Sequence, residues 1–258
     1  DSVELHILHQ VDTLPSNYLK GNKGNGISGL IISDDIISVG SSAFASMINL
    51  EEVHLSEAFT NIPVSLFDDC ENLKTVNIHD RIMSIGSYAF RGCALEEAII
   101  PDSVTDLGVY MFAGCSSLKK VKLPVTCKNV TSYMFSACSS LESIELPKMV
   151  TTIQEGAFNN CDALTDITWS PKITTIGNNA FSNCDGMVSI EFPDTIISMG
   201  SSVLAGCTAL KEIMLPTPIT SIPSYMFDGC TALENYQIPE QITSIGSYAF
   251  RNCDALTV

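Results

Sequence analysis

Basic residues are scarce in this sequence, and long apolar runs are missing. Thirteen Lys and Arg stand against 29 Asp and Glu, which gives a net charge of −16 at pH 7. Phosphate backbones and anionic membranes repel such a chain, so we expect no nucleic-acid partner and no lipid surface. No apolar run approaches the roughly 20 residues of a membrane-spanning helix, so we also expect no direct membrane insertion.

Catalytic and metal-binding patterns are lacking as well. The four histidines, His6, His9, His54 and His79, show no HExxH spacing and no third ligand, and the cysteines include no CxxC pair. The glycine-rich segment 21–26 lacks a Gly-Lys-Ser/Thr sequence and a following helix, so it does not qualify as a phosphate loop. We therefore expect no enzymatic activity, no cofactor and no metal site.

What the sequence has in abundance is repetition. Nine of its ten cysteines recur every 23 residues, with one step of 22, at Cys70, Cys93, Cys115, Cys138, Cys161, Cys184, Cys207, Cys230 and Cys253. A fixed short period is typical of a solenoid, in which each repeat contacts only its neighbours. Equivalent side chains in adjacent coils lie side by side, whereas a disulfide needs crossed Cβ vectors. We expect buried, unbridged thiols at these positions, with redox sensing or metal binding as lesser alternatives; Cys127 is off this register.

Aligned on the cysteines, the repeats share one strand pattern. In the repeat that starts at Cys138, the apolar residues Leu141, Ile144 and Leu146 precede Pro147. The alternation of apolar and polar residues predicts a strand with one buried face. Proline cannot donate to a sheet ladder, so it ends the strand.

The other limb of each repeat reads Ile-x-x-Ile-Gly-Ser-x-Ala-Phe, as in residues 82–90. Its serine is placed to cap a short helical turn. The phenylalanines form one column, predicted to stack in the core, with Leu204 filling one gap: Phe44, Phe67, Phe90, Phe112, Phe135, Phe158, Phe181, Phe227 and Phe250. The fold class predicted is a leucine-rich-repeat solenoid, a right-handed superhelix with a parallel β-sheet on the concave face and short helical turns or coil on the convex face.

The repeat resembles the BspA-type leucine-rich repeat, whose pattern is C-x-x-L-x-x-I-x-L-P-x-x-I-x-x-I-G-x-x-A-F. Residues 161–181 and 230–250 keep this pattern nearly whole. The resemblance implies a secreted or surface-attached protein, of a kind associated with adhesion to host or matrix proteins. It implies no catalytic residues.

We expect one solenoid over residues 1–258, with about eleven repeats of ~23 residues. Residues 1–26 form an atypical N-terminal repeat or cap, and residues 254–258 begin a further, truncated repeat. The chain begins at Asp1 without a visible signal peptide, as in a mature form or an excised fragment. It stops inside a predicted strand, and an open strand edge invites pairing. We expect a monomer, or end-to-end contact through this uncapped edge.

Two outward columns of side chains lie along the predicted sheet. In a leucine-rich repeat this is the concave face, the usual interaction surface. The columns vary from repeat to repeat while the core does not, which suits recognition and suits solvation too. Candidate ligand-binding residues are Glu52, His54, Thr75, Asn77, Glu97, Lys120, Lys122, Glu145, Asp166, Thr168, Glu191 and Glu212.

Two further groups have alternative interpretations. Lys119, Lys120 and Lys122 form a basic cluster, yet acidic residues stand at equivalent positions of neighbouring repeats. Charge pairing between strands therefore competes with an anion site. On the opposite limb, Tyr88, Tyr110 and Tyr133 occupy one column and form a candidate convex aromatic patch, because tyrosine is enriched at interfaces; a simple preference for tyrosine at this turn position is the alternative.

We conclude from the sequence that this is a non-catalytic, extracellular or cell-surface module. Its expected partner is a protein of the host or the extracellular matrix, bound through the concave strand face. The alternative is a passive spacer that displays another domain.

Overall fold

The computed structural model describes residues 3–7, 12–21 and 26–256. Two compact units, Asp1–Pro124 and Val125–Val258, make up the chain and are described separately. His9, most of the loop 21–26 and the last two residues of the predicted truncated repeat lie outside the described residues.

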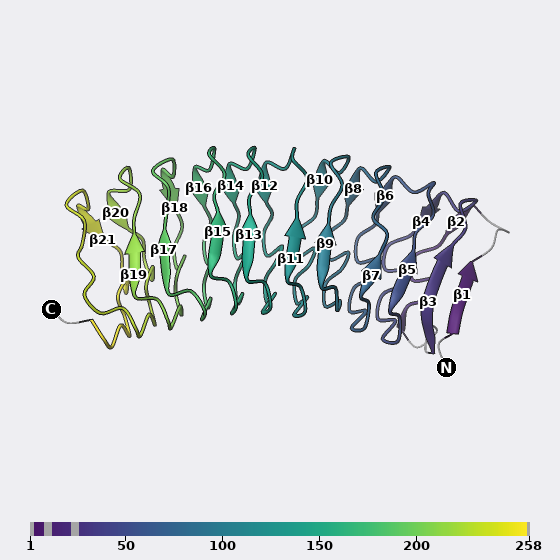
Figure 1. Cartoon of the computed structure of the whole chain (residues 1–258), viewed down its shortest axis with the longest axis horizontal. Helices are drawn as coiled ribbons and strands as arrows, with labels where there is room; N and C mark the ends of the chain where they lie inside the picture. Colours follow the sequence, from purple (N-terminus) through teal and green to yellow (C-terminus); the bar gives the residue numbers. More distant parts are fainter. Residues whose placement is uncertain (1–2, 8–11, 22–25, 257–258) are drawn as a thin grey trace. The chain divides into compact units, whose positions relative to one another are not determined.

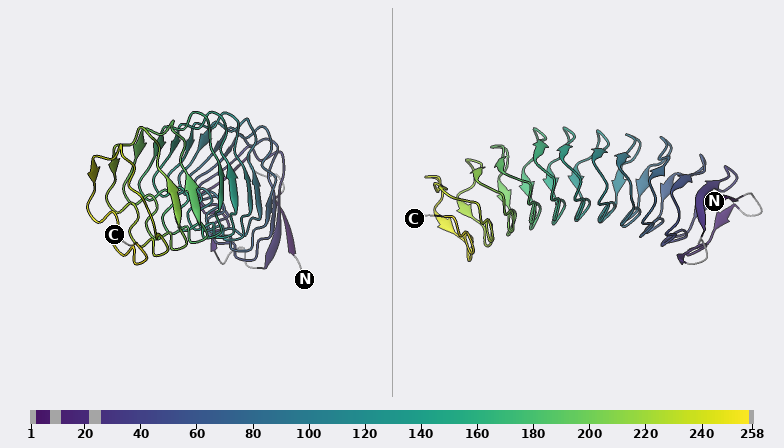
Figure 2. Two further views of the ribbon diagram at one scale, coloured as in Figure 1. Left: turned by 60° about the vertical axis from the view of Figure 1, so that its left-hand side comes forward. Right: turned by 60° about the horizontal axis from the view of Figure 1, so that its bottom comes forward.

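Both units consist of coils, about ten turns in all, in which most coils have one strand on each of two limbs, and every strand pair is parallel (Figures 1 and 2). In the first unit, the first-limb strands are β1 (Val3–Ile7), β3 (Ile27–Ile32), β5 (Glu52–His54), β7 (Thr75–Val76), β9 (Glu97–Ile99) and β11 (Lys120–Lys122). The short second-limb strands are β2 (Thr13–Leu14), β4 (Ser38–Val39), β6 (Asn61–Ile62), β8 (Ser84–Ile85) and β10 (Asp106–Leu107). The first limb forms the sheets β1-β3-β5-β7 and β11-β9, and the second limb forms β10-β8-β6 and β2-β4.

The second unit repeats this plan. Its first-limb strands are β13 (Ser143–Glu145), β15 (Asp166–Thr168), β17 (Ser189–Glu191) and β19 (Glu212–Met214). Its second-limb strands are β12 (Asn129–Val130), β14 (Thr152–Ile153), β16 (Thr175–Ile176), β18 (Ser198–Met199), β20 (Ser221–Ile222) and β21 (Ser244–Ile245). The first limb pairs as β13-β15 and β17-β19, and the second limb as β12-β14-β16-β18 and β20-β21.

The register of the strands follows the sequence period. Ile144 of β13 lies opposite Ile167 of β15, which is 23 residues later. Leu141, Ile144 and Leu146 are buried, whereas Ser143 and Glu145 between them are exposed. The alternation in the sequence thus becomes a strand with its apolar face on the core, as predicted.

The phenylalanine column forms the centre of the core in each unit. In the first unit, the rings from Phe44 to Phe112 stack with centroid separations of 5.8, 5.8 and 5.6 Å. In the second unit, the steps Phe135–Phe158 and Phe158–Phe181 measure 5.5 and 5.4 Å. Leu204 is fully buried at the position where the column lacks a ring. The predicted stack is confirmed within each unit.

The cysteines form a second file beside the rings. All ten are free thiols; eight of the periodic nine are buried as predicted, while Cys253 in the last coil is partly exposed. Most of the periodic thiols donate to a main-chain carbonyl of the preceding coil: Cys161 Sγ lies 3.1 Å from the Phe135 oxygen and Cys184 Sγ 3.2 Å from that of Phe158. The off-register Cys127 is also buried and donates to the Asn129 carbonyl at 3.2 Å. The thiol is thus an apolar filler that also acts as a donor.

Of the short helical turns or coil predicted opposite the sheet, the helical turns are not seen: the described residues contain no α-helix. Each turn segment instead holds two residues in the left-handed region four positions apart, such as Tyr88 (φ 60°) and Gly92 (φ 69°). The N–H groups of Tyr88, Phe90 and Gly92 donate to the next coil, at 3.0, 3.0 and 2.8 Å. In this segment, every second N–H group therefore donates to a carbonyl of the next coil rather than to one in its own coil. A left-handed residue also breaks the run of φ angles that a helix requires.

The serine predicted to cap a helix has a different role. Ser87 Oγ accepts a hydrogen bond of 3.2 Å from the Val109 N–H, which belongs to the next coil. Its hydroxyl thus helps to join two coils instead of starting a helix.

Candidate functional site: the strand face

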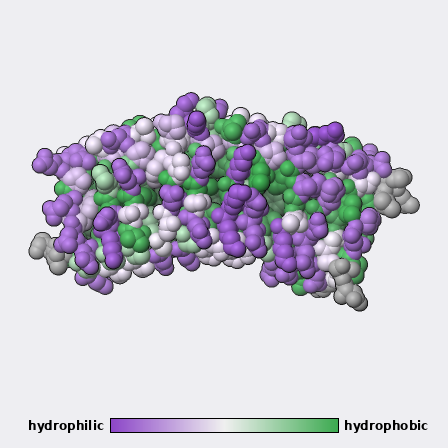
Figure 3. Space-filling view, in the orientation of Figure 1, coloured by the Kyte–Doolittle hydropathy of each residue, from purple (hydrophilic) through white to green (hydrophobic). Residues whose placement is uncertain are grey.

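The strand face is the surface formed by the outward residues of the first-limb strands. In the view of Figure 3, hydrophilic side chains cover most of the molecule and apolar surface emerges between them. Nearly all of the predicted binding residues are exposed on this face: Glu52, His54, Thr75, Glu97, Lys120, Lys122, Glu145, Asp166, Thr168, Glu191 and Glu212.

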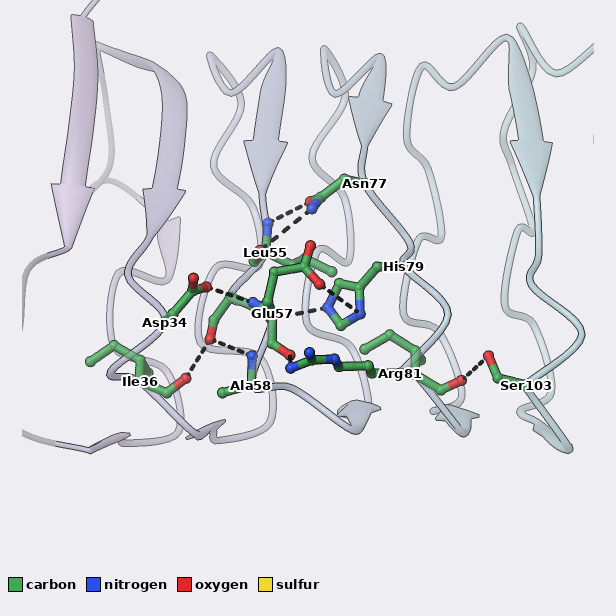
Figure 4. A network of polar contacts seen from close by, with 11 residues as sticks. Asp34, Ile36, Leu55, Glu57, Ala58, Asn77, His79, Arg81 and Ser103 are labelled. Atoms are coloured by element: carbon green, nitrogen blue, oxygen red, sulfur yellow. Dashed lines mark hydrogen bonds and ion pairs between the residues drawn. The ribbon is translucent and has the colours of Figure 1, made fainter.

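Asn77 is the exception among those candidates. Its Oδ1 accepts from the Leu55 N–H at 2.5 Å and its Nδ2 lies 3.4 Å from the Leu55 carbonyl (Figure 4). The side chain is half-buried and takes the place of a main-chain ladder bond to the preceding coil. Its amide is therefore occupied within the fold.

On the first unit, opposite charges pair across neighbouring coils. Lys120 lies 2.5 Å from Glu97, Lys119 lies 3.4 Å from Glu96, and Lys74 lies 2.9 Å from the carboxylate of the preceding coil. All these side chains are largely exposed, so each pair contributes only about 0.2–1 kcal/mol. The pairs neutralise much of this part of the strand face, as the charge-pairing interpretation predicts.

The strand face of the second unit is acidic and is not neutralised in this way. Its carboxylates are Glu145, Asp166, Glu191 and Glu212, and the outward strand positions hold no Lys or Arg. Residues opposite these acids are neutral: Thr168 faces Glu145, and Met214 faces Glu191. Asp166, Glu191 and Glu212 make no ion pair within the described residues of their unit. This surface is complementary to positive charge.

Among the described residues, the strand face of each unit has a hollow at a place where two neighbouring first-limb strands do not pair. One lies between β7 and β9 in the first unit, with a volume of about 430 Å³. The other lies between β15 and β17 in the second unit, with a volume of about 390 Å³. The second is lined by Trp169, the only tryptophan of the chain, and by Asp166 and Glu191. The sequence analysis placed Asp166 and Glu191 on the predicted sheet but did not foresee a hollow.

The repeat itself identifies the kind of protein. A family model of the BspA-type leucine-rich repeat region, comprising 6 copies, matches residues 37–165 and 151–258. The chain belongs to the BspA-type leucine-rich repeat family. A comparison with curated proteins found no match.

Solved structures of other leucine-rich repeat proteins agree with this assignment. A leucine-rich repeat protein from Bacteroides ovatus is 26% identical, with a TM-score of 0.84 over 95% of this chain and 69% of that one. A leucine-rich cell surface protein from Faecalibacterium prausnitzii is 25% identical, with a TM-score of 0.68 over 96% and 82%. A leucine-rich repeat protein from Eubacterium ventriosum, 22% identical with a TM-score of 0.59 over 90% and 78%, shares the fold.

In this BspA-type protein, the predicted tyrosine patch is divided between the two units. The Tyr88 and Tyr110 rings stack at 4.9 Å, and the Arg91 guanidinium lies 5.5 Å from the Tyr88 centroid. Tyr133 belongs to the second unit, where its hydroxyl lies 2.9 Å from Glu155 Oε1. Since Tyr88 stacks on Tyr110 and lies beneath Arg91, part of the aromatic surface of this pair is already used within the fold.

Arg91 is itself held by acids of the preceding coil. Its guanidinium bonds Asp68 at 2.6 and 3.1 Å and Asp69 at 2.9 Å. The hydrogen bond to Asp68 is the largest cause that raises the pKa of Arg91 above its ordinary value. The same arrangement recurs in the second unit, where Arg251 pairs with Asp228 and lies over Tyr225 and Tyr248. This motif therefore joins coils.

A polar network beneath β5 and β7 was missed by the sequence analysis (Figure 4). The His79 side chain is only 9% exposed, with Nε2 3.0 Å from the Ser56 carbonyl and Nδ1 3.7 Å from Glu57 Oε2. Ser56, fully buried, donates to the Ile36 carbonyl at 2.7 Å. The available signal was the serine that stands where most repeats have proline after the strand.

The described residues show neither a metal-binding cluster nor a membrane-spanning helix. Within residues 3–7, 12–21 and 26–256, no three His, Cys, Asp or Glu are grouped so as to hold a metal ion. Over the same residues, no helix has the length and apolar character to cross a membrane.

Proposed function

We propose that this chain is a protein-binding module of a secreted or cell-surface protein, and that it adheres to host or extracellular-matrix proteins through the strand face. The observation that carries the proposal is the acidic strand face of the second unit. Its carboxylates are exposed on a regular array of strands, and their neighbours across the ladder are neutral. A basic surface on a protein partner is the chemistry that complements it.

Membership of the family supports the extracellular placement. One structural relative at 25% identity is described as a cell surface protein. The fold supports a binding role because stacked repeats present an extended surface with a uniform core and variable outward positions. That both units form one array of about eleven repeats, and that the C-terminal edge makes end-to-end contacts, stay predictions.

The test is binding of the chain to a panel of immobilised extracellular-matrix proteins, measured by surface plasmon resonance at low and at moderate salt. Glu145→Lys/Glu212→Lys reverses two exposed charges on the acidic face. Glu71→Lys/Glu240→Lys is the control, because it makes the same change in net charge at exposed positions outside the strand face. We expect the first pair to slow association about tenfold or more and the control to have a much smaller effect.

A passive spacer is the second candidate, favoured by the charge pairs that neutralise the first unit's strand face. Lys120→Glu/Lys122→Glu tests this part of the surface. If the parent chain binds a panel protein and neither strand-face pair alters that binding, the strand face is not the binding surface. If the parent chain binds no panel protein and no host-cell extract, the spacer function is favoured over adhesion.

A further inference from the structure

The hollow between β15 and β17 interrupts an otherwise regular ladder. On either side of it, β13 pairs with β15 and β17 pairs with β19, each over three residues. Within the pair β13–β15, the Glu142 carbonyl accepts the N–H groups of Thr165 and Asp166 at 2.9 and 3.3 Å. The equivalent carbonyl one coil later is that of Thr165, and it accepts no main-chain N–H from the described residues of the next coil. An acceptor therefore lines the hollow without a ladder partner.

Large aromatic side chains lie beside this opening of the ladder. Trp169 and Phe192 occupy the position that is Leu or Ile in most other repeats. The Trp169 ring lies 5.6 Å from the Phe192 ring and meets the Phe181 ring edge-on at 6.1 Å. Two adjacent coils must therefore hold two large rings where a pair of aliphatic side chains would fit. Trp169 stays half-exposed and lines the hollow.

The acids at this hollow lack a counter-charge among the described residues of their unit. Asp166 and Glu191 both line it, together with the hydroxyl-bearing residues Thr165 and Ser189. Neither carboxylate makes an ion pair within the described part of its unit. An indole ring, two carboxylates and a carbonyl without a ladder partner thus line one hollow. Its volume of about 390 Å³ is within the range of small ligand sites.

The hollow between β7 and β9 provides an internal comparison. It arises at a similar break in the ladder and has a volume of about 430 Å³. However, it is lined by aliphatic residues and no aromatic ring, and its carboxylates Glu96 and Glu97 are already paired with Lys119 and Lys120. The two hollows therefore share only the break in the ladder. The aromatic ring and the unpaired acids are found in the hollow between β15 and β17.

We propose that the hollow between β15 and β17 binds an arginine side chain of a basic protein partner. This inference rests on the proposed function and specifies the chemistry recognised on the acidic strand face. A guanidinium is planar and stacks on indole, and its five N–H donors suit carboxylate and carbonyl acceptors of the kind that line this hollow. A lysine ammonium lacks the planar fork and is more strongly hydrated, so arginine is the better occupant.

The direct test uses a small probe, N-acetyl-arginine amide, which carries no terminal charges. Because Trp169 is the only tryptophan, its fluorescence reports on this hollow. We expect a saturable change with arginine, and about tenfold weaker binding of the citrulline analogue, which has the same shape without the charge. The lysine analogue should bind more weakly than arginine. Equal binding of the three probes, or no saturation, overturns the inference.

Substitutions localise the site. Asp166→Asn/Glu191→Gln should weaken arginine binding about tenfold, whereas Glu97→Gln in the other hollow should leave it unchanged. Trp169→Leu restores the residue typical of the repeat, so it keeps the fold; measured by calorimetry, it should abolish binding. If Glu97→Gln weakens binding as much as the double variant, the site is not this hollow.

The outcomes separate this inference from the proposed function. If a panel protein binds through Glu145 and Glu212 while Asp166→Asn/Glu191→Gln and Trp169→Leu leave its affinity unchanged, the hollow is not the arginine site and the proposed function stands. If the arginine probe binds as described while no panel protein binds, the hollow is a site and the proposed adhesion is wrong.

Discussion

The buried thiols make the stability of this protein sensitive to alkaline pH. Burial raises the pKa of Cys161 and Cys207 from 9.0 to about 12. The unfolded chain loses these protons near pH 9, whereas the folded chain keeps them. Stability is therefore fully present below pH 9 and is lost progressively as the pH rises from about 9 toward 12.

The size of the effect follows from the difference between the pKa of each thiol in the folded and in the unfolded chain. At pH 10, one unit above the unfolded value, each such thiol lowers the free energy of unfolding by about 1.4 kcal/mol. Cys161 and Cys207 together account for about 3 kcal/mol, a large share of the ~5–15 kcal/mol that stabilises a typical domain. Burial raises the pKa of Cys184 and Cys230 as well, so the total loss in the second unit is larger.

Urea unfolding followed by Trp169 fluorescence, at pH 7 and pH 10 with a reductant present, measures this loss. Cys161→Ser removes one titrating thiol. At pH 7 we expect it to be less stable than the parent, because the hydroxyl replaces a well-fitting sulfur in the core. Between pH 7 and pH 10, however, it should lose about 1.4 kcal/mol less than the parent does. Cys253→Ser, at the partly exposed thiol, is the control and should change the pH dependence less.

Two results would refute this reasoning. One is a parent chain whose urea midpoint is the same at pH 7 and pH 10. The other is rapid alkylation of Cys161 by iodoacetamide in the folded protein at pH 8.5, since a buried, protonated thiol should react only after unfolding.

Other substitutions test the core and the turns. Phe158→Ala should lower the free energy of unfolding by about 3–5 kcal/mol. Phe158→Leu should lower it much less, because the column already accommodates a leucine at Leu204. Equal losses for the two variants in urea unfolding would contradict the stacking argument. Ala137→Gly should stabilise the protein by about 1 kcal/mol, since Ala137 has φ 59° where glycine is unstrained; a lower thermal midpoint would count against this. Gly177→Ala should destabilise strongly, because its Cβ would lie 2.6 Å from the Glu155 nitrogen; an unchanged thermal midpoint would show that the coils can separate there.

Several features of the fold were predictable because they depend on patterns that every repeat shares. The 23-residue spacing set the strand register, as in the pairing of Ile144 with Ile167. The columns of Cys and Phe were predicted to be buried for the same reason: an apolar residue at a fixed position in every coil must lie on the shared core. The unbridged thiols followed from parallel side-chain vectors.

The candidate site was only partly predictable. The outward positions of Asp166 and Glu191 follow from strand alternation. That these acids make no ion pair with the described residues of their unit, while Glu97 pairs with Lys120, depends on which side chains meet across the ladder. The interpretation of Asn77 as a surface ligand did not foresee that its amide replaces a ladder bond.

The sequence by itself determined the repeat, its period and the inward or outward direction of each strand residue, because these depend on local alternation and on copies of one motif. Only the tertiary structure decided the form of the turn and the opening of the sheet. Left-handed residues such as Tyr88 are stabilised by hydrogen bonds to the next coil, so helix propensity within one repeat gives the wrong answer. The ladder opens between β15 and β17, beside the Trp169 and Phe192 rings, and also between β7 and β9, where no ring lines the hollow. Whether two strands pair depends on how two neighbouring coils pack together, and that is a property of the pair of coils and not of either one alone.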